Sequence, residues 1–166
     1  DELSYMEKIK MIADAKKCFE SQFEKRLQLI KVGSPLFVKT SSGLQDALTG
    51  VEKAVGFTKG GETFEIVHSL AKWKRIALKK YGFSSGEGFY TDMNAIRRDE
   101  DMDNLHSIYV DQWDWEKVIN REDRNIDYLK NTVKSIINAL VDTLELVKEK
   151  FPEVKTEFTR DVFFIT

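Results

Sequence analysis

Apolar residues at helical spacing predict two long helices, one in the first part of the sequence and one in the last. In the first segment they recur at steps of three, four or seven, at Tyr5, Ile9, Ile12, Phe19, Phe23, Leu27 and Ile30. The second pattern begins at Ile126 and ends at Phe151, because the following Pro152 cannot continue a helix. Each segment has one apolar face, as expected of a helix that packs on a core.

Short extended segments are predicted between these helices. The first helical pattern stops at Gly33-Ser34-Pro35, and Pro35, which lacks an N–H, fits a strand start or an edge strand. Strand-like apolar residues follow at 36–38, 54–57 and 64–67. Lys59-Gly60-Gly61 predicts a turn between the last two strands, and the polar segment 41–50 is typical of turns.

A long-looped hairpin is the clearest strand signal. Its strands are predicted at 89–97 and 106–115, on either side of the very polar segment 98–105. A further apolar strand is predicted at 162–165.

One face of the hairpin combines apolar with polar side chains. Because side chains alternate along a strand, Gln112 and Asp114 share a face of the second strand, and Arg97 can converge with them from the first. Burying such groups without partners would cost about 1–3 kcal/mol each. The face therefore either lines a polar pocket or lies in solvent with an ordinary ion pair, and the pattern leaves both interpretations open.

A shorter helix is predicted from Ser69, a good N-cap residue, to about Tyr81. Its first turns carry Lys72, Lys74 and Arg75, and positive charge there opposes the helix dipole. An anionic ligand would explain these cations, although a plain solvated face is the more frequent cause.

Composition excludes several classes of protein. Lys and Arg number 26 against 28 Asp and Glu, so the net charge of −2 argues against a protein that tracks nucleic-acid phosphates. The single Cys18 cannot form an internal disulfide, which fits a reducing compartment, and we expect a cytoplasmic protein. No apolar run approaches the ~20 residues of a membrane-spanning helix.

Familiar catalytic signatures are absent. The sequence has no phosphate loop, no dinucleotide-binding glycine motif and no nucleophile elbow. Ser85-Gly86-Glu87-Gly88 favours a turn over a phosphate contact. His68 and His106 have no third ligand at metal spacing, so we assign no metal ligands and interpret each as a satisfied polar residue in a strand.

Several long motifs nevertheless resemble one enzyme family, the ammonia-dependent asparagine synthetases (aspartate–ammonia ligases), which are relatives of the class II aminoacyl-tRNA synthetases. The resemblance extends from about Phe19 to Lys150. The stretches that carry it are Leu44-Gln45-Asp46 with Gly50-Val51-Glu52-Lys53-Ala54-Val55, His68-Ser69-Leu70-Ala71-Lys72-Trp73-Lys74-Arg75, Gly86-Glu87-Gly88-Phe89-Tyr90-Thr91, Arg97-Arg98-Asp99-Glu100-Asp101 and His106-Ser107-Ile108-Tyr109-Val110-Asp111-Gln112-Trp113-Asp114-Trp115-Glu116.

The resemblance implies an α+β fold of the class II aminoacyl-tRNA synthetase type, with a six- to eight-stranded, mainly antiparallel sheet flanked by helices. It implies that residues 1–166 are the N-terminal half of a single catalytic domain, with the third ATP motif in the C-terminal half, so that this fragment alone is inactive. The first helix and the Pro35 strand resemble the motif that usually builds a homodimer interface.

The activity implied by the resemblance is the joining of ammonia to aspartate. ATP is cleaved to AMP and pyrophosphate through a β-aspartyl adenylate, with Mg²⁺ held mainly by the other half. The partners are thus aspartate, ammonia and ATP, with no nucleic acid and no membrane. The alternative is a synthetase-like module that has lost catalysis and binds an amino acid or a partner.

The resemblance also assigns roles to residues. Asp46, Arg97 and Gln112 are the expected catalytic residues, with Asp46 serving the ammonium or, as the lesser option, the substrate α-amino group. Aspartate is expected to be bound by Ser69, Lys74 and Asp114, with Lys74 holding its α-carboxylate and Asp114 either binding its α-amino group or orienting Lys74. ATP is expected to be bound by Arg97, Asp99 and Glu100. The family normally has Pro where this sequence has Arg98, a change that we expect the loop to tolerate.

Overall fold

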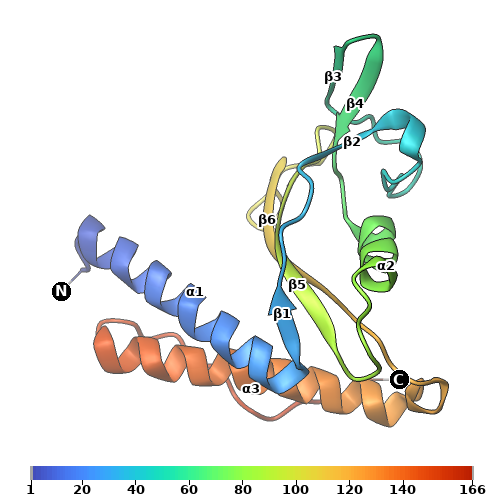
Figure 1. Cartoon of the computed structure of the whole chain (residues 1–166). Coiled ribbons are helices and arrows are strands. Elements are labelled where there is room, and N and C mark those ends of the chain that lie inside the picture. The colour runs from blue at the N-terminus through green and yellow to red at the C-terminus, as the bar shows by residue number, and fades with distance from the viewer. Residues whose placement is uncertain (1, 166) are drawn as a thin grey trace. The chain divides into compact units, whose positions relative to one another are not determined.

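The computed structural model describes residues 2–165 (Figure 1). These residues form two compact units. The helical unit comprises residues 2–29 with 119–165, and the sheet unit comprises residues 30–118. None of the helices in this described stretch combines the length and the apolar character needed to cross a bilayer.

The helical unit pairs α1 (Tyr5–Leu27) with α3 (Ile126–Lys150). Ser4 and Glu7 form a reciprocal capping box at the start of α1, which satisfies N–H groups that have no partner inside the helix. Residues near the end of α1 face the middle of α3, and residues nearer its start face the end of α3, so the two helices are antiparallel.

Three differences from the sequence prediction fall in this unit. The predicted first helix extends too far, because Gln28 adopts a left-handed conformation that ends α1 and places Ile30 in strand β1 (Leu29–Lys31). The apolar face of α1 is buried only at Phe19, Phe23 and Leu27, whereas its first residues are exposed. The strand predicted at 162–165 is wrong: this segment pairs with no strand in the described residues.

The sheet unit contains the predicted hairpin as β5 (Gly88–Ile96) and β6 (Tyr109–Lys117), in a sheet of order β1-β5-β6. The second sheet has the order β2-β4-β3, formed by β2 (Phe37–Lys39), β3 (Gly56–Lys59) and β4 (Glu62–Ile66). Pro35 thus precedes an edge strand, as predicted. The described residues form two three-stranded sheets rather than one sheet of six to eight strands.

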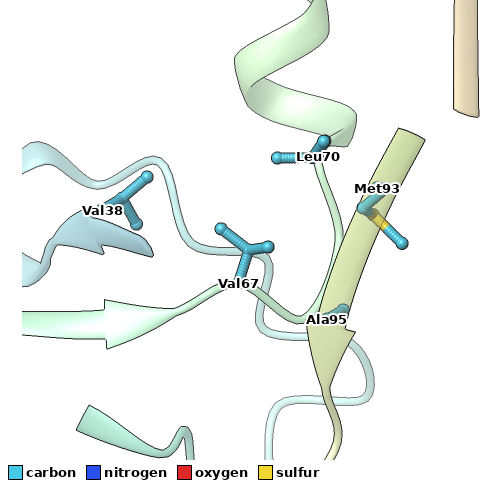
Figure 2. Close-up of a cluster of buried hydrophobic side chains, with 5 residues drawn as sticks. All are labelled: Val38, Val67, Leu70, Met93 and Ala95. Carbon is cyan, nitrogen blue, oxygen red and sulfur yellow. The ribbon is translucent and has the colours of Figure 1, made fainter. Parts of the chain in front are cut away.

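Helix α2 (Ala71–Lys80) follows β4 in the chain, and the short segment between them contributes to a small apolar core (Figure 2). The short 3₁₀ helix η1 (Thr40–Ser42) precedes the loop of residues 43–55. A second such turn, η2 (Arg121–Asp123), precedes α3 in the helical unit. The buried core residues are Val38, Val67, Leu70, Met93 and Ala95. They hold β2, β5 and the segment between β4 and α2 against one another.

Ser69 is not the N-cap of α2, which corrects the sequence prediction. The cap position is Leu70. The Ser69 hydroxyl, one residue earlier, accepts from the Ala71 N–H at 3.3 Å and donates to the Asp46 carboxylate. The two histidines also lie outside strands: His68 occupies a bend after β4, and His106 lies in the loop before β6, where Asp103 binds it. The segment Ser85–Gly88 is a turn that leads into β5, as predicted.

Candidate functional site

Every residue singled out for chemistry lies in the sheet unit, on three neighbouring elements. The loop of residues 43–55 carries Asp46, and the segment from 68 into α2 carries Ser69 and Lys74. The β5–β6 hairpin and its connecting loop carry the others, which are Arg97, Asp99, Glu100, Gln112 and Asp114.

The hairpin register brings Arg97 and Gln112 to one wall. Met93 pairs with Gln112 and Thr91 with Asp114, so the side chains of these residues and of Arg97 share a face, as the alternation predicts. Arg97, Glu100 and Gln112 line a cavity of about 300 Å³ together with loop residues 105–107. The pocket interpretation is therefore favoured for Arg97 and Gln112.

Arg97 is partly anchored by the main chain. Its Nε–H donates to the carbonyl oxygen of His68, 3.2 Å away. A guanidinium has five N–H donors in a planar fork, so four others remain on a residue that lines the cavity. This arrangement suits recognition of a phosphate or a carboxylate.

Lys74 and Asp114 form a buried ion pair. Their side chains are only 10% and 15% exposed, and Lys74 Nζ donates to Asp114 Oδ1 and, at 3.0 Å, to the carbonyl oxygen of Trp115. Glu116 Oε2 lies 3.6 Å from the same Nζ, beyond ordinary hydrogen-bond length. Lys74 thus has two strong partners for its three donors. Sequence reasoning missed Glu116, although it shares a face with Asp114 by strand alternation.

Asp46 is held at the start of α2. Its carboxylate accepts from the Ser69 hydroxyl, and its carbonyl oxygen lies 3.1 Å from Nδ1 of His68. Gln45 clamps the same segment, since its Oε1 accepts from the His68 N–H and its Nε2 donates to the Ile66 carbonyl oxygen. Sequence reasoning missed His68 as a connecting residue. Its position directly before Ser69 in a family motif was the available signal.

Asp99 faces the loop that carries Asp46 rather than the cavity. Its carboxylate accepts from the Lys53 N–H at 2.7 Å and from Arg98 Nε at 3.0 Å. The Lys53 N–H, and after it the Arg98 side chain, lower the pKa of the Asp99 carboxyl below its ordinary value. Because this carboxylate is already engaged, its role toward ATP stays a prediction. Arg98 makes a surface contact with Asp99 within the loop.

The predicted site residues therefore form three groups rather than one contact network. Arg97, Glu100 and Gln112 share a cavity, Lys74 pairs with Asp114, and Asp46 pairs with Ser69. His68 connects the first group to the third. Among the described residues, no three His, Cys, Asp or Glu side chains are grouped so that they could hold a metal ion.

Comparison with known proteins identifies the family. A family model described as aspartate–ammonia ligase matches residues 6–166. The aspartate–ammonia ligase of Clostridium tetani is 51% identical over 168 aligned residues, covering 99% of this chain and 49% of the relative. That of Clostridium perfringens is 52% identical over 167 residues, covering 99% and 50%. The chain thus spans about half the length of the curated relatives it matches.

Solved structures support the fold. A pyrrolysyl-tRNA synthetase structure from Desulfitobacterium hafniense superposes with a TM-score of 0.56 at 9% identity, covering 78% of this chain and 46% of that one. A second structure of the enzyme gives 0.53 at 11% identity, covering 79% and 46%. The class II aminoacyl-tRNA synthetase-like α+β fold expected from the sequence is confirmed. On the match of the family model and the identity of these relatives, the chain belongs to the aspartate–ammonia ligase family.

Proposed function

We propose that the complete protein makes asparagine from aspartate and ammonia, with ATP cleaved to AMP and pyrophosphate. In the first step an oxygen of the aspartate β-carboxylate attacks the α-phosphorus, and the bond to the leaving pyrophosphate breaks. In the second, the nitrogen of ammonia attacks the acyl carbon of the β-aspartyl adenylate, AMP leaves, and the nitrogen gives up a proton. The convergence of Arg97 and Gln112 on one cavity carries this proposal.

Arg97 and Gln112 act on charge that develops during these steps. Adenylation builds negative charge between the β-carboxylate and the α-phosphate, where a planar guanidinium can donate to both groups. The Arg97 Nε–H bond to His68 orients this fork. Gln112 donates from its amide to the acyl oxygen when the tetrahedral centre forms. Neither step needs a nucleophile from the protein.

Aspartate is bound at the buried ion pair. We assign the substrate α-carboxylate to Lys74. Among residues 2–165, its third N–H has only the distant Glu116 carboxylate as a partner. Asp114 holds the Lys74 ammonium in place and offers its other oxygen to the substrate α-amino group. Ser69, beside the same helix start, completes the amino-acid site.

Asp46 serves the incoming ammonium. A carboxylate next to the Ser69 hydroxyl can bind the cation and accept the proton that must leave before nitrogen attacks. The loss of that proton frees the lone pair of ammonia for the acyl carbon.

Binding of ATP and Mg²⁺ requires side chains in addition to those of residues 2–165. Arg97, Asp99 and Glu100 are the ATP contacts that we assign to this chain. Mg²⁺ would neutralise the charge of the phosphates when bound, and the described residues offer no grouped ligands for it. We propose that the chain supplies the N-terminal half of one catalytic domain, with the third ATP motif in the other half.

We also propose a homodimer in the cytoplasm. The first turns of α1 expose Tyr5, Ile9 and Ile12 by 88%, 61% and 56%, and Leu36 beside Pro35 is 50% exposed. Covering these apolar side chains with a second copy would remove them from water. A single cysteine fits a reducing compartment.

The test is aspartate-dependent exchange of labelled pyrophosphate into ATP, measured in the complete protein. Arg97→Ala should reduce exchange by about a thousandfold or more, because adenylation loses its phosphate contact. Arg98→Ala is the matched control and should stay within about twofold, as expected for an exposed loop residue. Exchange within a few-fold of the parent in Arg97→Ala would remove Arg97 from the mechanism. An unsubstituted protein that binds aspartate without any exchange would instead be a binding module.

A further inference from the structure

His68 is held in a buried position between β4 and α2. It is 2% exposed, and its neighbours Val67 and Leu70 are 1% and 0% exposed. Both neighbours belong to the apolar core in Figure 2, so the main chain at His68 is fixed by packing from two sides. A residue fixed in this way can serve as a reference point for less regular segments nearby.

Two parts of the proposed site rest on this residue. Nδ1 of His68 lies 3.1 Å from the carbonyl oxygen of Asp46, and the His68 carbonyl oxygen accepts from Arg97 Nε at 3.2 Å. The His68 N–H donates to Gln45 Oε1 at 2.9 Å. His68 therefore contacts the loop that carries Asp46 and, through its main chain, the arginine on the cavity wall.

The partners of the ring define its tautomer. A carbonyl oxygen can only accept, so Nδ1 must carry a proton to bind Asp46. Nε2 is buried with no hydrogen-bond partner among the described residues. A proton on Nε2 would bury an unpaired donor and a charge, whereas a neutral ring leaves only an unused lone pair there. The His68 ring thus donates one hydrogen bond from Nδ1 and makes none at Nε2 among the described residues.

We infer that His68 is a positioning residue that sets the place of Asp46 relative to Arg97. Its Nδ1–H bond fixes the main chain of Asp46, and this keeps the Asp46 carboxylate beside Ser69. The inference rests on the proposed function, in which Asp46 serves the ammonia step. Loss of the Nδ1–H bond should therefore impair capture of the adenylate by ammonia more than formation of the adenylate.

Two isosteric variants separate the ring nitrogens. The amide nitrogen of Asn overlays His Nδ1 and that of Gln overlays Nε2, so only His68→Asn retains the donor to Asp46. In the complete protein, both variants should keep aspartate-dependent pyrophosphate exchange within about threefold. His68→Gln should lower ammonia-dependent asparagine formation about tenfold or more, whereas His68→Asn should stay near the parent. Equal ammonia-dependent rates in the two variants, or a parallel fall of exchange and ammonia capture, would overturn the assignment.

A measurement on the unsubstituted protein guards against variants that fail to fold. Nitrogen-15 NMR of the histidine side chains should show one neutral ring protonated at Nδ1. The other histidine, His106, is exposed, so persistence of that signal in His106→Gln assigns it to His68. A ring protonated at Nε2 at this position would overturn the inference. Failure of the proposed function gives a different result, since the unsubstituted protein would then show no exchange at all.

Discussion

Ion pairs of the helical unit lie at its surface, whereas the sheet unit buries one. Arg26 and Arg160 both bind Asp142, with side chains 33%, 43% and 25% exposed. Lys150 and Asp14 are 49% and 38% exposed. In the sheet unit, Lys74 and Asp114 are 10% and 15% exposed.

This difference distinguishes exposed ion pairs that connect α1 with α3 from a buried ion pair within the candidate site. An exposed pair contributes about 0–1 kcal/mol, because water and salt screen it. A buried pair must overcome the desolvation of both ions, and apolar residues of similar volume often stabilise a protein at least as well. Stability alone gives little reason to bury the Lys74–Asp114 pair, and its burial is consistent with the substrate-binding role that we propose for it. Substitutions matched across the two units test this contrast.

The largest effect is expected from Asp46→Asn, compared with Asp142→Asn in the helical unit. Asp46→Asn keeps the size of the side chain but removes the charge and the proton acceptor. It should slow asparagine formation from ammonia by about 10²–10⁴-fold while sparing pyrophosphate exchange. Asp142→Asn should change neither rate, because its partners are surface arginines.

Two further measurements identify what Asp46 does. Raising the pH supplies free ammonia and should partly rescue Asp46→Asn. Hydroxylamine attacks without deprotonation at neutral pH, so its rate should fall least. If the exchange, ammonia and hydroxylamine rates all fall together and pH has no effect, Asp46 binds aspartate instead.

Lys74→Met should have the next largest effect, compared with Lys150→Met. Without Lys74 the buried Asp114 carboxylate loses its ion-pair partner. It must then take up a proton or stay charged without compensation, which destabilises the sheet unit by about 3 kcal/mol. Lys150→Met should change stability by less than about 1 kcal/mol.

Urea unfolding checks this pair of variants. Far-UV circular dichroism follows the helices, and tryptophan fluorescence reports on the sheet unit, which contains Trp73, Trp113 and Trp115. Similar shifts of the unfolding midpoint in the two variants would show that burial does not distinguish the pairs.

The smallest effect is expected from acid. Arg160, and after it Arg26, hold the pKa of the Asp142 carboxyl below its ordinary value. A carboxyl with a lowered folded-state pKa stabilises the fold above its unfolded pKa of about 3.9 and loses that contribution as the pH falls through the folded value. The stability difference between the parent and Asp142→Asn should stay constant from about pH 7 to 5 and shrink below about pH 4. Thermal unfolding at each pH measures it, and a difference that persists at about pH 2 would contradict the assignment.

Regular elements were predictable because their patterns extend over many residues. The apolar periodicity of α3 predicts Ile126–Lys150 almost to the residue, and strand alternation predicts that Arg97 and Gln112 share a face of the hairpin. The errors fall where no period exists. Ile30 continues the helical spacing but follows a left-handed Gln28, and the apolar segment 162–165 has strand composition without a neighbouring strand.

The sequence by itself determined the long helices, the faces shared along the hairpin strands and, through its motifs, the family. Tertiary structure alone decided that Asp46 meets Ser69 across 23 residues and that His68 stands between Asp46 and Arg97. It also showed that Lys74 and Asp114, 40 residues apart, form a direct ion pair. The period of apolar residues specifies which side of a helix or strand faces the core, because the same side is buried again at each repeat along the element. It does not specify which loop covers that side, since the loop of residues 43–55 is placed by individual hydrogen bonds that have no repeat along the chain.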